Sequence, residues 1–141
     1  RFTGGGLIQQ KRERNAFQTY VEQLQIKVSG PNQPAGNLSG GNQQKLVLAR
    51  EIDAAPKLLL IGQPTRGVDI GAIEFIYERL MEMKAQGCAI LMVSVELEEV
   101  LSLSDRILVM SNGEQTGMVN REDADEKSLG LMMAGIEEDA A

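Results

Sequence analysis

Two short and continuously apolar segments, separated by one helix, constrain the fold of this chain more than any other feature. Residues 58–61 are apolar throughout, and residues 88–94 are apolar up to the final Ser94, so both segments lack the alternation of apolar and polar side chains that marks a half-exposed strand. Such runs are typical of strands buried on both faces of a parallel sheet. Between them, apolar residues recur on one helix face that ends near Gly87: Ile73, Ile76, Tyr77 and Leu80. The order strand, helix, strand predicts a right-handed βαβ crossover and an α/β fold.

Helix and turn signals predict the elements around this unit. The expected elements are, in chain order, a helix at 10–24, a loop at 29–36, a helix from Ser39 to before Pro56, a short helix at 96–104, and a hairpin of 107–110 and 115–119 turned at Asn112-Gly113. The glycine-rich segment 2–8 is not a phosphate-binding P-loop, because no Gly-Lys-Ser/Thr sequence follows it. The acidic segment 137–141 is expected to fray.

The composition excludes several kinds of site. The 141 residues include no histidine, so imidazole metal ligands, Ser-His or Cys-His nucleophiles and histidine pH switches are excluded. The single cysteine, Cys88, rules out an internal disulfide and is expected to be a small core residue. The longest central apolar run, 88–93, is too short to cross a bilayer, and no basic-then-apolar leader precedes it. The chain begins at Arg1 and not at Met, so we expect it to be a piece of a longer protein.

Charge is distributed unevenly along the chain. Residues 1–50 hold 7 Lys+Arg and 2 Asp+Glu, whereas residues 51–141 hold 7 and 18, which gives +5 and then −11. Nucleic-acid binding needs a dense cationic face, so the acidic second part argues against such a partner. The basic cluster at 11–14 is interpreted as a solvated helix face, and the glutamates at 96–99 as the polar face of a short helix and not as metal ligands.

The segment Leu38-Ser39-Gly40-Gly41-Asn42-Gln43-Gln44-Lys45 carries the clearest chemical signal. A serine and two glycines at a helix start leave backbone N–H groups open to an anion, which the helix dipole also favours. The alternative is an ordinary capped helix that follows a flexible loop. These residues alone leave both interpretations open.

Together with the apolar strand and Pro64-Thr65-Arg66-Gly67-Val68-Asp69, this octapeptide resembles the signature motif of ATP-binding cassette (ABC) proteins, in the importer branch for simple sugars and nucleosides. The resemblance extends from about Phe2 to Gly135. It implies that the signature loop reaches across a dimer interface, where Ser39, Gly40, Gly41 and Asn42 would bind the γ-phosphate of ATP held by the opposing domain. Asp69 matches the aspartate of the family's D-loop at that interface, and it also suits an N-cap of the following helix.

The resemblance also marks three departures from the family's catalytic pattern. Where the Walker B strand ends in Asp and Glu, this chain has Gly62 and Gln63, and where many members carry a switch histidine it has Val95. Glycine has no side-chain oxygen for a magnesium shell, and glutamine cannot accept a proton from water. Three losses in one composite site imply that its hydrolytic function is weak or absent. An engineered Glu→Gln trap would explain Gln63 alone.

The resemblance therefore implies a P-loop NTPase-like α/β fragment that lacks the P-loop. Residues 1–36 would be the end of a helical subdomain, and residues 37–141 the C-terminal part of the second, degenerate nucleotide-binding domain. The whole protein would be a peripheral ATPase at the cytoplasmic face of the membrane, using ATP and Mg²⁺. Its partners would be another ABC half, permease subunits and, indirectly, an extracellular solute-binding protein. The fragment alone would be inactive, with neither ATP nor metal bound. The alternatives are a soluble non-transport ABC ATPase and a non-catalytic dimerisation module.

Overall fold

The computed structural model describes residues 3–4 and 7–136, and it confirms the predicted α/β class. The helices and strands are, in chain order, β1 Thr3–Gly4, β2 Leu7–Ile8, α1 Gln10–Gln23, α2 Gly40–Asp53, β3 Leu58–Gly62, α3 Ile70–Ala85, β4 Ala89–Val93, α4 Leu97–Leu103, β5 Arg106–Ser111, β6 Glu114–Asn120 and α5 Glu126–Met133. The chain forms two compact units, with residues up to 59 and 64–90 in the first and residues 60–63 and from 91 onward in the second.

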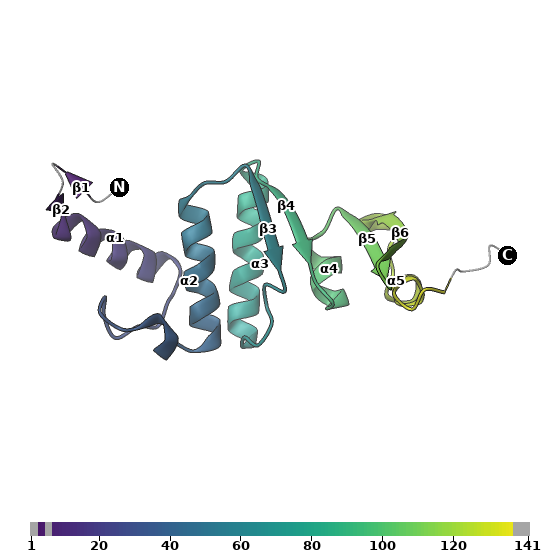
Figure 1. Ribbon diagram of the computed structural model, residues 1–141, viewed down its shortest axis with the longest axis horizontal. Helices are drawn as coiled ribbons and strands as arrows, with labels where there is room; N and C mark the ends of the chain where they lie inside the picture. The colour runs from purple at the N-terminus through teal and green to yellow at the C-terminus, as the bar shows by residue number, and fades with distance from the viewer. Residues whose placement is uncertain (1–2, 5–6, 137–141) are drawn as a thin grey trace. The chain divides into compact units, whose positions relative to one another are not determined.

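In the first unit, helices α2 and α3 lie side by side (Figure 1). Both helices start at a side-chain cap, Ser39 for α2 and Asp69 for α3, as their sequences predict. The two helices supply most of the buried apolar residues of this unit: Leu48, Ala49, Ala72, Phe75, Ile76, Leu80 and Met83. The pair is therefore held by a common apolar core, which fixes the two helix starts as close neighbours.

Strands β3 and β4 are neighbours in a two-stranded sheet. The Ala89 amide donates to the Lys57 carbonyl, and the Gln63 amide donates to the Val93 carbonyl. Because the pairing advances in the same direction along both strands, they are parallel, as the βαβ pattern predicts.

Burial on both faces of these strands, however, is a wrong prediction for this chain. Leu59 is buried, whereas the alternate positions Leu58, Leu60, Leu91 and Val93 are between 57% and 68% exposed. The reason is that no described segment of this chain covers their side chains. One face of the two strands is thus buried or half-buried, and the other is exposed.

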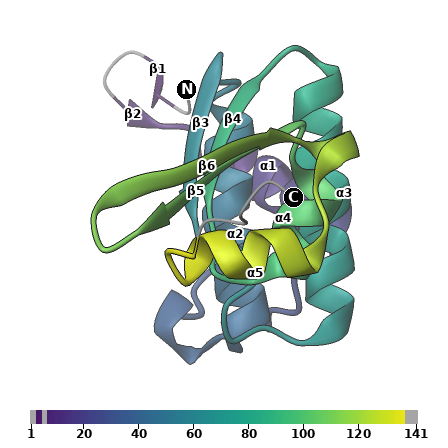
Figure 2. The same ribbon diagram turned by 90° about the vertical axis from the view of Figure 1, so that its right-hand side faces the viewer.

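The second unit contains a β-hairpin that packs against α5 (Figure 2). Strands β5 and β6 pair in antiparallel register, with Ile107 opposite Val119 and Leu108 opposite Met118. Asn112 and Gly113 turn the hairpin with positive φ angles of 51° and 84°, as expected for an Asn-Gly turn. Ile107, Val109 and Leu129 form the core, with side chains of α4 packed around it.

Three other features differ from the sequence-based expectations. The sequence pattern did not predict α5 or the short pair β1–β2. Glu99 is 1% exposed, so the interpretation of its side chain as part of a polar helix face is wrong; Glu96 and Glu98 are exposed, as expected. Glu99 is the one fully buried residue of α4. The expectation for residues 137–141 lies outside the described residues.

The structure also bears on two single features. Cys88 is buried, as predicted for a small core residue. Among the described helices, none combines the length and the apolar character that a membrane span requires.

Candidate functional site

The start of helix α2 presents hydrogen-bond donors to solvent. Ser39 is the N-cap, and Ser39 and Gly40 are exposed, whereas Gly41 is buried. The amides of the first helical turn have no carbonyl partner within the helix. Their partial positive charge, added along the helix as a dipole, favours an anion at this end. The local geometry therefore permits phosphate binding at residues 39–41.

Asn42 connects Ser39 to Lys27 through hydrogen bonds of its side-chain amide. Its side-chain Oδ1 accepts the backbone N–H of Lys27 at 2.8 Å, and its Nδ2 donates to Ser39 Oγ at 2.8 Å. Its own backbone N–H also donates to Ser39 Oγ, at 3.4 Å. The sequence predicts that Asn42 contacts phosphate. In the structure it is half-buried, and both ends of its side-chain amide are bonded within its own chain.

The two glycines lie against the loop that precedes α3. A Cβ atom at Gly40 would be 3.0 Å from the carbonyl oxygen of Gly67, and one at Gly41 would be 3.0 Å from Asp69 Oδ2 and 3.1 Å from the Ala72 methyl group. These distances are below ordinary van der Waals contact. Any side chain at these two positions would therefore push against its neighbours within the chain, so close packing favours glycine here independently of a ligand.

Asp69 is placed beside the signature segment, and its capping role is confirmed. Its Oδ1 accepts the Ala72 N–H at 3.0 Å at the start of α3. A second contact joins the signature segment to the loop before α3, because Gln44 Nε2 donates to the Pro64 carbonyl at 3.2 Å. The structure thus places Asp69 next to the segment of Ser39, Gly40, Gly41 and Asn42, although the two segments are separate in the sequence. Of these residues, Ser39, Gly40 and Asp69 are exposed.

Lys45, the last residue of the octapeptide, also links the two helices. It is 9% exposed, and its Nζ lies 4.3 Å from the centroid of the Phe75 ring and 3.5 Å from the Gln25 carbonyl oxygen. A cation over an aromatic face is attractive, and more so when it is withdrawn from water. This role was not predicted from the sequence, because nothing in the spacing of Lys45 and Phe75 indicates their contact.

The three positions that depart from the catalytic pattern belong to the second unit. A Cβ atom at Gly62 would meet no described heavy atom within 4 Å, and the residue has no positive φ angle, so neither packing nor backbone conformation requires glycine there. Gln63 has a φ angle of 49° and pairs through its backbone with Val93. Val95 is 63% exposed. None of these side chains carries a carboxylate or an imidazole, the groups that would hold a metal or accept a proton.

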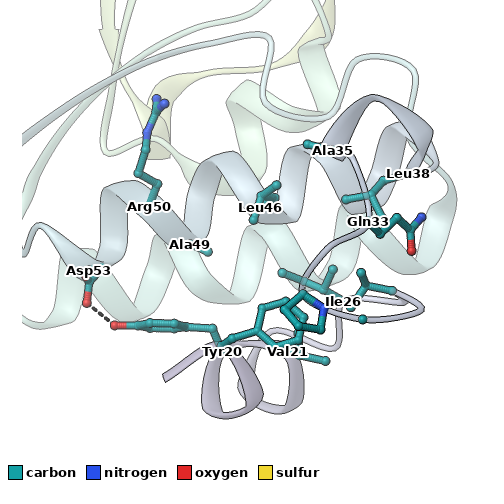
Figure 3. A pocket seen from close by; sticks show the side chains of 14 residues that line it. Tyr20, Val21, Ile26, Gln33, Ala35, Leu38, Leu46, Ala49, Arg50 and Asp53 are labelled. Atoms are coloured by element: carbon teal, nitrogen blue, oxygen red, sulfur yellow. Dashed lines mark hydrogen bonds between the residues drawn. The ribbon is translucent and has the colours of Figure 1, made fainter. Parts of the chain in front are cut away.

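The described residues contain no group of three His, Cys, Asp or Glu side chains able to hold a metal ion. A pocket of about 360 Å³ lies between α1, the loop that follows it, and α2 (Figure 3). Its wall is mainly apolar, with Val21, Ile26 and Leu46 among its residues, and the Tyr20 hydroxyl donates to Asp53 at one end. Arg50 also lines the pocket, but its guanidinium pairs with Glu51 at 2.8 Å. A mainly apolar wall that carries the Asp53 carboxylate does not suit a phosphate group. The start of α2 is thus the better candidate for nucleotide contact.

Comparisons with known proteins point to one family. No protein-family model matches the sequence. The chain is 45% identical over 129 residues to the ribose import ATP-binding protein RbsA of Clostridium perfringens, and 42% identical over 130 residues to the nucleoside import ATP-binding protein NupA of Lactococcus lactis. Each match covers 92% of this chain and 26% of the relative, so the chain spans about a quarter of their length.

The fold is also found in a solved structure. The dimeric structure of MJ0796, described as a bacterial ABC transporter cassette, matches with a TM-score of 0.68 and 22% identity. The match covers 84% of this chain and 51% of the cassette chain. The described fold therefore resembles about half of that solved chain.

Proposed function

We propose a function from the premise that this chain belongs to the ATP-binding cassette family, to which its relatives and its fold assign it. In this proposal the chain is part of an ATPase that drives import of a simple sugar or nucleoside. It supplies the signature loop to the ATP site of a partner cassette half. Ser39, Gly40, Gly41 and Asn42 form that loop, and Asp69 lies beside it at the dimer interface.

The observation that carries the proposal is the exposed start of α2. Ser39 and Gly40 face solvent, with a hydroxyl group and first-turn amides that no helix carbonyl satisfies. A surface that presents donors outward suits a phosphate brought by another domain. That MJ0796 is described as a dimer supports an arrangement of two cassettes for this fold.

The chain's own nucleotide site is proposed to be degenerate. Gly62 and Gln63 stand where a magnesium-ordering carboxylate and a general base are expected, and Val95 stands where many members have histidine. Loss of a general base typically reduces a rate by about 10²–10⁴. ATP binding at such a site would close the dimer without turnover, while hydrolysis takes place at the partner's site.

The proposed position in a longer protein rests on the motif resemblance. We assign residues 1–36 to the end of a helical subdomain and residues 37–141 to the C-terminal part of the second nucleotide-binding domain, because residues 38–45 resemble the signature motif and residues 58–63 the Walker B strand. That the matches cover 26% of the relatives and 51% of a cassette supports only the assignment to part of a longer protein. The apolar side chains left exposed on β3 and β4 support this assignment, because a missing segment of the sheet would cover them. The whole protein would lie at the cytoplasmic face of the membrane with its permease, receiving solute from an extracellular binding protein.

The test uses the longer protein reconstituted with its permease. Ser39→Ala removes one donor to the γ-phosphate at the active site and is expected to lower ATPase turnover about 10²–10³-fold. Gln63→Ala alters the degenerate site and is expected to leave turnover nearly unchanged. Near-normal turnover of Ser39→Ala would contradict the proposal.

For the chain alone, the proposal predicts no appreciable ATP binding, because it has no P-loop lysine. Isothermal titration calorimetry with MgATP checks this expectation. Micromolar binding would show that the nucleotide site lies within these 141 residues.

A further inference from the structure

Ser39 has a defined hydrogen-bond pattern at its hydroxyl oxygen. The oxygen lies 2.8 Å from Asn42 Nδ2 and 3.4 Å from the Asn42 backbone nitrogen, and both nitrogens are donors. A hydroxyl group has two acceptor lone pairs and one proton to donate. When both lone pairs are directed at Asn42, the proton is left to point away from it.

The orientation of the Asn42 amide is itself fixed. Its Oδ1 accepts the Lys27 N–H at 2.8 Å, so the opposite end, the NH₂ group, must face Ser39. Exchanging the two ends would place a donor against the Lys27 N–H and an acceptor against Ser39. In that case the Ser39 hydroxyl would donate inward to the amide oxygen, and no proton would be left for an external acceptor.

We infer that Asn42 is a positioning residue that acts through Ser39, setting the Ser39 hydroxyl as a donor to the terminal phosphate of the partner's nucleotide. This inference rests on the proposed function and deepens it, since phosphate oxygens only accept hydrogen bonds while a serine hydroxyl can do either. Asn42 then serves the phosphate without contacting it, because one end of its amide faces Lys27 and the other faces Ser39.

The neighbouring Gln43 offers a matched control. It carries the same amide group in the same helical turn, but its Nε2 donates to the Leu38 carbonyl at 2.8 Å. Gln43→Ala therefore removes a hydrogen bond of similar length from the same loop and leaves the Ser39 hydroxyl pattern intact.

The experiment is a double-mutant cycle in the longer protein reconstituted with its permease. Ser39→Ala, Asn42→Ala, the double variant and Gln43→Ala are compared by ATPase kcat and KM, with thermal unfolding measured in parallel. Asn42→Ala is expected to lower kcat about tenfold with little change in KM, because a hydrogen bond to a charged acceptor is weakened. In the Ser39→Ala background, Asn42→Ala is expected to cause no further loss. Gln43→Ala is expected to keep the wild-type kcat.

The outcomes separate the two proposals. Near-normal turnover of Ser39→Ala would contradict both the proposed function and this inference. If Ser39→Ala loses turnover while Asn42→Ala does not, or if the two losses multiply in the double variant, only the positioning role is overturned. A loss of kcat in Gln43→Ala equal to that in Asn42→Ala, with equal shifts in thermal unfolding, would show general loop damage and would also overturn it.

Discussion

At the scale of single residues, Gly41 shows why a glycine in a binding motif is a poor target for a functional test. A Cβ at this position would lie 3.0 Å from Asp69 Oδ2 and 3.1 Å from the Ala72 methyl group. A side chain at Gly41 would therefore disturb the packing of α2 on α3 before it could obstruct any phosphate. Ser39 is exposed, so its substitution reports on external contacts more directly.

Asp125 gives a prediction about pH. Its carboxylate caps α5 and accepts N–H groups of Ser128 and Lys127 at 3.0 and 2.9 Å, and the Ser128 hydroxyl at 2.8 Å. These hydrogen bonds, the Ser128 backbone bond first, hold the pKa of Asp125 below its ordinary value. A depressed folded-state pKa stabilises the fold above the unfolded pKa, and the effect is lost as pH falls through the folded value.

The expected result is a difference between Asp125→Asn and wild type that depends on pH. Asparagine also caps helices but carries no charge, so the variant should have the lower thermal unfolding midpoint at pH 7. The gap should narrow as pH falls below the ordinary aspartate pKa. Asp123→Asn, which changes the same charge outside the cap, serves as control. A gap that stayed constant down to pH 3 would refute the role of the ionised cap.

At the scale of elements, the sequence predicts those whose signals are local. The hairpin was predictable because Asn112-Gly113 itself sets the turn, and α2 and α3 because Ser39 and Asp69 cap them. Helix α5 was missed because it has only eight residues and includes Gly130, so propensity does not favour it. The hairpin that stabilises it is identified only once the chain is folded. For the same reason, the contact of Asp69 with the signature segment could not be derived from spacing.

Leu129 tests whether packing on the hairpin holds α5. Its side chain is 1% exposed in the core with Ile107 and Val109. Leu129→Ala is expected to reduce the free energy of unfolding by about 2–5 kcal/mol, since it removes buried methyl groups and leaves a cavity. Met133→Ala on the same helix, where the side chain is 40% exposed, should change it by about 0.5 kcal/mol or less. Similar effects of the two substitutions in urea unfolding would contradict this account of α5.

At the scale of the whole molecule, the apolar pattern predicts a covering layer that the described residues do not supply. Leu60, Leu91 and Val93 alternate with less exposed positions, yet each is more than 60% exposed, and Met110 and Met118 of the hairpin are more than 55% exposed. Soluble proteins seldom leave many large apolar side chains uncovered. The prediction that these strands are buried on both faces is therefore wrong for this chain. Their exposed apolar face nevertheless agrees with the proposal that the chain is about half of a cassette.

Leu91→Glu tests whether the exposed face of β4 becomes covered in the longer protein. In the chain alone, where Leu91 is 61% exposed, a charge stays in water, and the free energy of unfolding should change by about 0.5 kcal/mol or less. In the longer protein, a covering segment would force the same carboxylate into an apolar layer without a partner, which should cost about 3 kcal/mol or more. Gln115→Glu adds the same charge at an exposed polar position of β6 and should be mild in both. Thermal and urea unfolding of both proteins measure the difference. If Leu91→Glu is equally mild in the longer protein, then β4 keeps an open face there as well, and the missing half of the sheet must pack elsewhere.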